Sequence, residues 1–227
     1  MLTAIYLICA ACSLFMGVAG LRQLATTPTL ALLFTLPTVL AIPYDSIVIA
    51  VGSFVGEGPQ LIALTWLRFL LHVFTLPTLA IALALLARGA SVRWASHPAA
   101  MPVAVLLAVA TLGAGVFGEL MGLTLAPQHR SDVLLYNHAH PVGPPPGALL
   151  LLAAAMVYGG AIGVRARWPW IILAALYTVL VQAVPDAGLC GALVNTGEVL
   201  LLGAILLATR RFAASPSVEA TPVTVRE

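Results

Sequence analysis

Long apolar runs, separated by short segments that contain polar residues, Gly or Pro, make up most of the chain. Hydropathy and turn residues predict seven helices, over residues 1–21, 29–55, 60–87, 101–125, 147–164, 168–184 and 189–209. Pro43 and Asp45 interrupt the second run. This run is therefore either one helix or a shorter helix that ends near Tyr44 and precedes a re-entrant segment at 47–55. The pattern predicts a bundle of about seven transmembrane helices.

The composition places this bundle in a membrane. The 227 residues are 61% hydrophobic and 8% charged, whereas soluble domains carry about 25% charged residues. We therefore expect an all-α integral membrane protein, multi-pass in the cell membrane, with a single helical-bundle domain over residues 1–211. The polar segment 212–227 is predicted to be a disordered cytoplasmic tail. A net charge of +2, spread thinly, makes no nucleic-acid-binding surface.

The arginines indicate how the helices cross the membrane. If seven helices alternate in direction, most of the arginines fall in connections on one side: Arg22, Arg88, Arg93, Arg165, Arg167, Arg210 and Arg211. The connections on the other side receive only Arg130. Because basic residues are enriched in cytoplasmic connections, the N-terminus is predicted to lie outside and the C-terminus in the cytoplasm.

Several charged or amide side chains lie within or beside the predicted helices. Charged groups at membrane depth are costly, and they usually face the interior of a bundle. Arg68 and His72 are four residues apart and share a helix face, as do Asn195 and Glu198, which are three apart. At 1.5 Å per residue the buried groups fall in the outer half of the bundle, which predicts a shared polar cavity. The candidate catalytic residues are Asp45, Glu57, Arg68, His72, Glu119, Asn195 and Glu198.

Two simpler interpretations remain for these residues and for the aromatic residues near them. Arg68 could only pair with Glu119 or Glu198 and so hold helices together, since buried ion pairs are weak evidence for function. Aromatic residues near membrane ends are ordinarily interfacial or packing residues, although together with acids they could stabilise a cationic ligand. The candidate substrate-binding residues are Tyr44, Phe54, Trp66, Phe69 and Phe117.

The connection over residues 126–147 is long for so small a protein, and it is rich in proline. It contains four possible metal ligands: His129, Asp132, His138 and His140. Their spacing matches no established zinc site, so neither a metal nor another cofactor is expected. We expect this segment to be an exposed lid over the cavity, stiffened by the prolines at 144–146.

Motifs that are missing narrow the enzyme class. The chain has no aspartate-rich diphosphate motif, no Walker loop, no G-x-S-x-G and no HExxH. Acid–base chemistry on a lipophilic molecule remains possible. A carboxyl group in an apolar pocket has a raised pKa and can donate a proton at neutral pH, while nearby Arg and His side chains tune or relay protons.

Three segments resemble motifs of a known family. PYDSIVIAVGSFVGEG (43–58), LRFLLHVFTLP (67–77) and LVNTGEVLLL (193–202) resemble bacterial membrane-bound terpene cyclases of drimentine-type indole sesquiterpenoid pathways. The Arg-, Ala- and Leu-rich composition is also similar to that of actinobacterial proteins. The resemblance implies a class II type cyclase that protonates the terminal alkene, or an epoxide, of a prenylated indole, which we expect to be farnesylated. A drimane-like ring system then forms without loss of diphosphate.

The resemblance also suggests roles for the candidate residues. The proton donor would be Glu57, Glu119 or Glu198, with Asp45 in hydrogen-bonding support. Arg68 would keep a carboxylate ionised or orient a polar end of the substrate. Two further residues would tune or relay protons: His72 and Asn195.

Two other functions are compatible with the same polar residues. A proton-coupled small-molecule transporter also needs ionisable groups within the membrane, although the chain has no convincing internal repeat. Another lipid-handling enzyme, such as a carotenoid cyclase or hydratase, would use similar acid chemistry. Under the preferred interpretation the partners are a lipophilic prenylated small molecule and the lipid bilayer, with no nucleic acid. The oligomeric state is left open.

Overall fold

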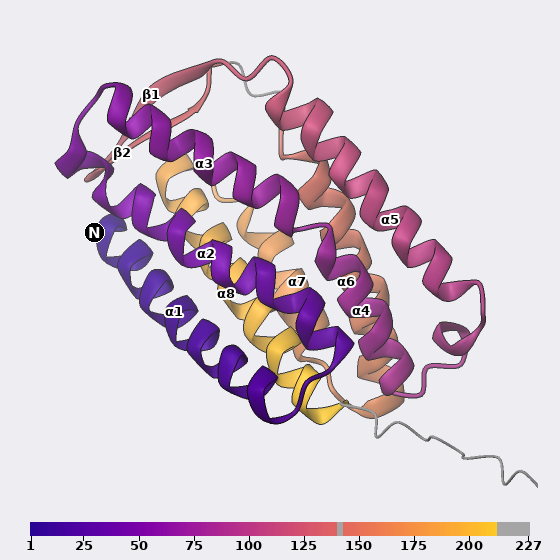
Figure 1. The fold of residues 1–227 in the computed structure, drawn as a ribbon. Coiled ribbons are helices and arrows are strands. Elements are labelled where there is room, and N and C mark those ends of the chain that lie inside the picture. Colours follow the sequence, from indigo (N-terminus) through magenta and orange to yellow (C-terminus); the bar gives the residue numbers. More distant parts are fainter. Residues whose placement is uncertain (140–142, 213–227) are drawn as a thin grey trace, which may run out of the picture.

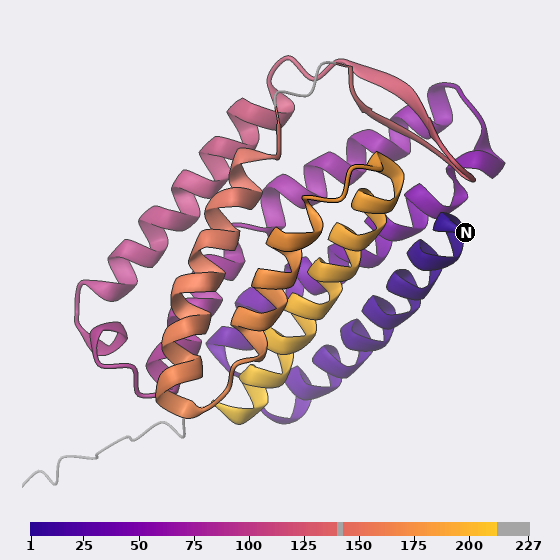
Figure 2. The same cartoon turned by 180° about the vertical axis from the view of Figure 1, so that it is seen from behind.

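A computed structural model describes residues 1–139 and 143–212, in which long helices run side by side (Figures 1 and 2). The elements in chain order are α1 (Leu2–Thr26), α2 (Leu30–Val55), α3 (Pro59–Thr75), α4 (Thr78–Gly89), the 3₁₀ turn η1 (Trp94–Ser96), α5 (Ala100–Gly115), the π-helical turn η2 (Val116–Leu120), β1 (Leu125–Arg130), β2 (Val133–His138), α6 (Pro146–Ala166), α7 (Trp170–Val181) and α8 (Ala187–Arg211).

Six helical segments of the described chain are long and apolar enough to cross a membrane, with α3 and α4 counted as one segment over Pro59–Gly89. The protein is therefore a multi-pass membrane protein by the length and composition of its helices. The run predicted at 168–184 forms only the 12-residue helix α7, about 18 Å long, because the chain turns before Pro185. The count of seven crossings and their orientation stay predictions.

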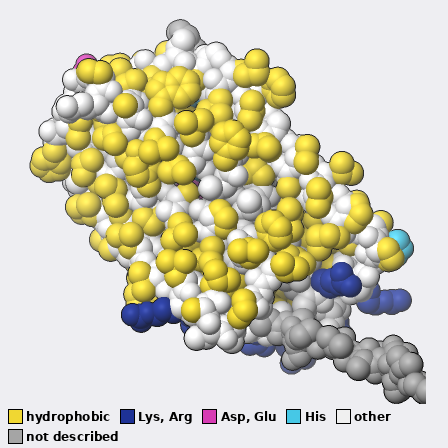
Figure 3. Space-filling model, in the orientation of Figure 1, with side chains coloured by type: hydrophobic (Ala, Val, Ile, Leu, Met, Phe, Trp, Pro, Cys, Tyr) yellow, Lys and Arg dark blue, Asp and Glu magenta, His cyan; other side chains and the backbone are white. Residues whose placement is uncertain are grey.

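The two ends of the bundle differ in charge. We call the end at which α1, α3, α6 and α8 begin the hairpin end, because the two strands lie there (Figure 1). Basic side chains gather at the opposite end, where the space-filling view shows them at the edge of a mostly hydrophobic surface (Figure 3). The connections at that end carry the arginines that the sequence pattern grouped on one side.

Prolines affect two of the helices differently. The helix predicted over 60–87 is divided at Pro77 into α3 and α4. In contrast, α2 continues through both Pro37 and Pro43 to Val55. The structure thus has one long helix here, and not a short helix followed by a re-entrant segment.

The described residues are mostly helical, as expected of an all-α membrane protein, but the long connection after α5 contains an antiparallel hairpin that the sequence pattern did not predict. Strand β1 pairs with β2, and Arg130 lies opposite Val133. The two-residue turn between them contains Ser131 at a φ of 56°, a left-handed conformation that such tight hairpin turns require. The helix predicted to reach residue 125 ends earlier, at Leu120 of η2.

The hairpin is inserted between the helices, and the expected exposed lid is instead a partly buried element. The side chains of β2 alternate between two clusters. Val133 and Leu135 pack against residues of α1, α2 and α8, whereas Leu134 and Tyr136 pack against α2 and α3. All four side chains are buried. Strand β2 therefore forms a fixed wall at this end of the bundle.

Close contacts hold the hairpin against α1 and α2. Gly52 of α2 passes so near β2 that a Cβ atom there would overlap the carbonyl oxygen of Leu134. The Asp132 carboxylate accepts hydrogen bonds from the backbone N–H groups of Leu2 and Thr3, at 2.9 and 3.2 Å. Because the first N–H groups of a helix lack internal partners, Asp132 caps α1 from the hairpin turn.

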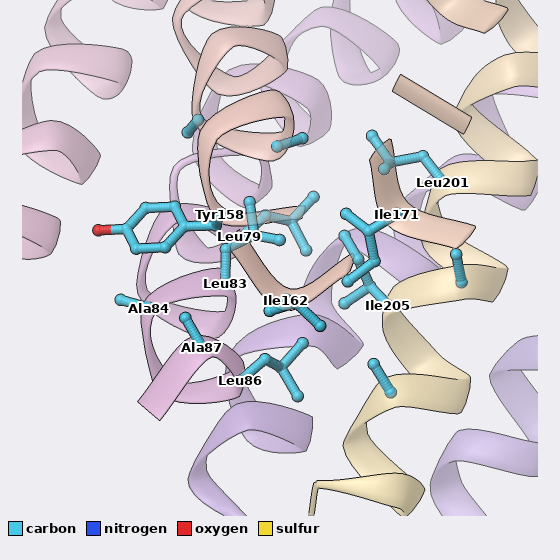
Figure 4. Close-up of a cluster of buried hydrophobic side chains, with 14 of the residues drawn as sticks. Leu79, Leu83, Ala84, Leu86, Ala87, Tyr158, Ile162, Ile171, Leu201 and Ile205 are labelled. Atoms are coloured by element: carbon cyan, nitrogen blue, oxygen red, sulfur yellow. The ribbon is translucent and has the colours of Figure 1, made fainter. Parts of the chain in front are cut away.

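The half of the bundle away from the hairpin has an apolar core. Leu83, Ile162, Ile171 and Ile205 are fully buried there and come from four different helices (Figure 4). Phe212 packs against this core, and its ring lies edge-on to Trp168 at 6.3 Å. Phe212 thus belongs to the bundle, although the tail was predicted to begin there. The remainder of that predicted tail, 213–227, lies outside the described residues.

Candidate active site

A cavity of about 520 Å³ lies beneath the hairpin, between α1, α2, α3, α4, α6, α7 and α8. Its volume is in the range of small-ligand sites. Most of the lining side chains are apolar, which suits a lipophilic ligand.

Helix periodicity explains which residues line the cavity. On α8 the lining positions are separated by one, three or four residues: Cys190, Gly191, Val194, Asn195, Glu198, Leu201 and Leu202. On α2 the spacing is the same: Thr38, Ile42, Asp45 and Ile49. Such spacing keeps side chains on one helix face. The span from Cys190 to Leu202 corresponds to about 18 Å along the helix, so the cavity is elongated.

Asp45 is the centre of a polar network on one wall of the cavity. Its Oδ1 atom lies 3.4 Å from Nε of Arg68, and its Oδ2 atom accepts a hydrogen bond of 3.4 Å from Nδ2 of Asn195. Oδ1 of Asn195 in turn accepts a hydrogen bond of 2.9 Å from Ser46. The network joins α2, α3 and α8, and its groups all come from segments that the sequence pattern singled out.

Arg68 is held by a second contact. Its side chain is 9% exposed, and its Cζ atom lies 5.1 Å from the ring centroid of Phe69. Phe69 also lines the cavity, and its ring meets the ring of His138 edge-on at 5.6 Å. The Arg68 guanidinium is therefore fixed between a carboxylate and an aromatic face.

Two other carboxyl groups, those of Glu119 and Glu198, also face the cavity. Neither Glu119 nor Glu198 has a hydrogen-bond or ion-pair partner among residues 1–139 and 143–212. Glu119 is 4% exposed and belongs to the π-helical turn η2, a geometry that often occurs at functional sites. Glu198 lines the same cavity as Asp45, Arg68 and Glu119.

His72 lies one helical turn after Arg68 and also lines the cavity. Its ring has no hydrogen-bond partner within the described part of the chain. An imidazole in this position can accept or donate a proton. The structure thus brings together six of the candidate catalytic residues: Asp45, Arg68, His72, Glu119, Asn195 and Glu198.

Glu57 does not belong to this group. It lies on the surface in the α2–α3 connection, where its Oε1 atom is 2.8 Å from Nε2 of His129 on β1. Its side chain is half exposed, and it does not line the cavity. The prediction that Glu57 is a candidate donor is corrected accordingly, because the short connection turns this carboxylate outward.

Most of the candidate substrate-binding aromatic residues also face away from the cavity. Phe54 and Phe117 are 83% and 72% exposed, and Trp66 is also exposed. Tyr44 donates a hydrogen bond of 3.0 Å to the carbonyl of Leu64 and packs beside the hairpin. Phe117 and Trp66 each lie two residues before a cavity residue, and residues two apart point to opposite sides of a helix. Phe69 alone of the five lines the cavity.

The polar lining residues that were not among the candidates include Tyr6, Arg130, Asn137 and Gln182. Arg130 could have been recognised from the sequence, because it is the one arginine assigned to the connections of the outer side. Asn137 reaches the cavity because it shares a strand face with Leu135, and that face could not be assigned without the hairpin. No feature of the sequence distinguished Tyr6 or Gln182 as a cavity residue.

The cavity ends in apolar side chains on the side away from the hairpin. Leu79, Leu201 and Leu202 line this floor and also belong to the apolar core, in which Figure 4 labels Leu79 and Leu201. Beyond them the buried core is formed by Leu, Ile and Ala side chains. The cavity is therefore closed toward the end at which the arginines gather.

The possible metal ligands of the long connection are dispersed. His129 pairs with Glu57, His138 packs on Phe69, and Asp132 caps α1. His140 lies outside the described residues. Within the described ranges, no three His, Cys, Asp or Glu side chains come together as a metal site.

Comparisons of the chain with protein families, with curated proteins and with solved structures gave no match. The function must therefore be argued from the cavity and from the motifs that the sequence contains.

Proposed function

We propose that this protein is a membrane-embedded class II type terpene cyclase. It would protonate the terminal alkene, or an epoxide, of a farnesylated indole substrate and close a drimane-like ring system without loss of diphosphate. The observation that carries this proposal is the placement of Glu119 and Glu198. Both carboxyl groups face one elongated, largely apolar cavity, and neither has a partner among the described residues.

The cyclisation requires the substrate to gain one proton at the first step and to lose one proton at the last step. A carboxyl O–H transfers its proton to a terminal alkene carbon, which forms a C–H bond and leaves a carbocation and a carboxylate. Electrons of the neighbouring alkene then form a C–C bond, and the cation moves along the chain as each ring closes. A base finally removes a proton from carbon, so that the product is an isomer of the substrate.

The remaining polar groups suit supporting roles. Asp45, held by Arg68 and Asn195, provides a fixed negative charge at the wall of the cavity, which would stabilise a passing cation. His72, without a partner in the described chain, would return a proton to the donor carboxyl. Apolar walls would exclude water and thus prevent capture of the cation.

The apolar floor favours a cyclase over a proton-coupled transporter. A transporter needs a route that reaches both faces of the membrane, usually with polar groups along it. Here Leu79, Leu201 and Leu202 close the cavity, and the core beyond them is apolar. A closed pocket suits a substrate that enters and leaves on the same side.

The proposal is tested with purified protein in lipid nanodiscs and a farnesylated indole substrate. We expect a product of unchanged mass from the wild type. At least one of E119Q and E198Q should abolish its formation, while the surface variant E57Q should retain it. A product that gains one water would indicate a hydratase. Proton-coupled uptake into liposomes without any product, or full turnover by both cavity variants, would contradict the cyclase.

A further inference from the structure

The hairpin end of the cavity presents hydrogen-bond donors that have no partner within the described part of the chain. The hydroxyl of Tyr6 lies beside Gly191, where a Cβ atom would be only 3.1 Å from it. Tyr6 lines the cavity, and its hydroxyl has no hydrogen-bond partner within residues 1–139 and 143–212. The hydroxyl is therefore free to bind a ligand.

Asn137 and Arg130 add further donors at the hairpin end of the cavity, where a Cβ atom on Gly191 would also lie 3.5 Å from Nη1 of Arg130. Oδ1 of Asn137 accepts a hydrogen bond of 2.9 Å from the backbone N–H of His138, which leaves the Nδ2 amide as a donor. Arg130 donates from Nη1 to the carbonyl of Ala187 at 3.0 Å and from Nη2 to Gln128. It pairs with no carboxylate of the described chain. A guanidinium has five N–H groups, so others remain available.

Toward the opposite end of the cavity Thr38 is also a lining residue, but its hydroxyl already donates a hydrogen bond of 2.9 Å to the carbonyl of Thr75. The floor of the cavity is formed by Leu79, Leu201 and Leu202. A ligand with a polar head and an apolar chain therefore fits the cavity in one orientation only, with its head at the hairpin end. Because the free groups at the hairpin end are mainly donors, the head should carry acceptors, and carbonyl oxygens fit best.

We propose that Tyr6, Asn137 and Arg130 bind the carbonyl oxygens of the substrate head, and that the prenyl chain points toward the leucine floor. This inference rests on the proposed function. It also identifies Glu198, and not Glu119, as the proton donor, because the terminal alkene of the substrate then lies deep in the cavity. Glu198 is about 10 Å further along α8 than Gly191 and one turn before Leu202. Glu119 lies at the hairpin end of its helix, in a wall shared with Asn137.

Binding by nanodisc-embedded protein tests the head site without turnover. The ligands are a farnesylated indole that carries the two amide carbonyls of a cyclic dipeptide, and 3-farnesylindole, which has none. In an E198Q background, Y6F should weaken binding of the first ligand by about threefold to tenfold, the effect of one lost hydrogen bond. Binding of 3-farnesylindole should not change.

Two further variants strengthen this test. N137D keeps the acceptor for the His138 N–H group and removes the free donor, so it should show the same ligand selectivity if Y6F folds poorly. Y136F removes the hydroxyl of another buried tyrosine of the hairpin end, one outside the cavity lining, and should affect neither ligand. Equal losses for both ligands, or no loss in Y6F and N137D, would overturn the head site.

Turnover separates this inference from the proposed function. Product formation that survives in E198Q but is lost in E119Q would overturn the orientation and leave the cyclase intact. If the wild type forms no isomer but the variants still discriminate between the two ligands, the cyclase fails and the head site stands.

Discussion

Arg68 and Asp45 approach each other inside the bundle, with Nε of the first 3.4 Å from Oδ1 of the second. The pair joins α3 to α2, and Asn195 connects it to α8. It is mostly buried, with 9% and 18% of the two side chains exposed. A simple ion pair would satisfy both groups, but the same cavity also holds the carboxyl groups of Glu119 and Glu198, which have no partner among residues 1–139 and 143–212.

Removal of one member of this pair should destabilise the bundle. R68M leaves the Asp45 carboxylate without its cation, so we expect a loss of about 3 kcal/mol in the free energy of unfolding. The double variant D45N/R68M should recover most of that loss, because neither charge remains. Denaturant unfolding in detergent micelles measures both, and R22M, at an exposed arginine of the opposite end, should differ little from wild type. A double variant no more stable than R68M would contradict the pairing.

The hairpin should be undocked by a single methyl group. G52A places a Cβ atom where the carbonyl oxygen of Leu134 lies, so either α2 or β2 must move. We expect a stability loss of about 3 kcal/mol and a large fall in turnover, because β2 forms a wall of the cavity. The matched variant G113A, on α5 with open space around it, should be at least as stable as wild type, because Ala favours a helix more than Gly does. Thermal unfolding followed by circular dichroism compares the two.

The leucine floor should set the length of the prenyl chain. L201F reduces the depth of the cavity, so turnover of a farnesylated substrate should fall by about tenfold, the scale of one hydrophobic group that no longer fits. A geranylated analogue, shorter by one isoprene unit, should be turned over nearly as before. L200F, one residue away on the exposed side of α8, should leave the preference unchanged. Equal loss for both chain lengths in L201F would argue against a floor at this position.

Depth along each helix could be predicted from the sequence, and this placed the main polar residues correctly in one cavity. Arg68 with His72, and Asn195 with Glu198, share faces because three or four residues make about one helical turn. The rotation of each helix about its axis, which decides whether a side chain faces the cavity, was predicted less well. Phe117 lies two residues before Glu119 and so points outward, although both have nearly the same depth.

The hairpin could not be recognised from local pattern. Strand β2 is buried on both faces, so its side chains Val133 to Tyr136 lack the alternation of polar and apolar residues that marks a half-buried strand. Its position depends on Gly52, which lies more than eighty residues earlier in the chain. Contacts of this kind arise from the packing of the whole bundle. Residues that reach the cavity through the hairpin, such as Asn137, were missed for the same reason.

The most direct test of a cavity carboxyl as proton donor is deuterium incorporation. Purified protein in nanodiscs, equilibrated in D₂O, is given the farnesylated indole substrate, and the product is examined by mass spectrometry and NMR. The account predicts an isomer that carries one deuterium on the carbon of the former terminal alkene. It also predicts that no product forms in E198Q, while E57Q matches wild type. A cyclised product without deuterium at that carbon, or with undiminished yield in both E119Q and E198Q, would contradict proton delivery by a carboxyl group of this cavity.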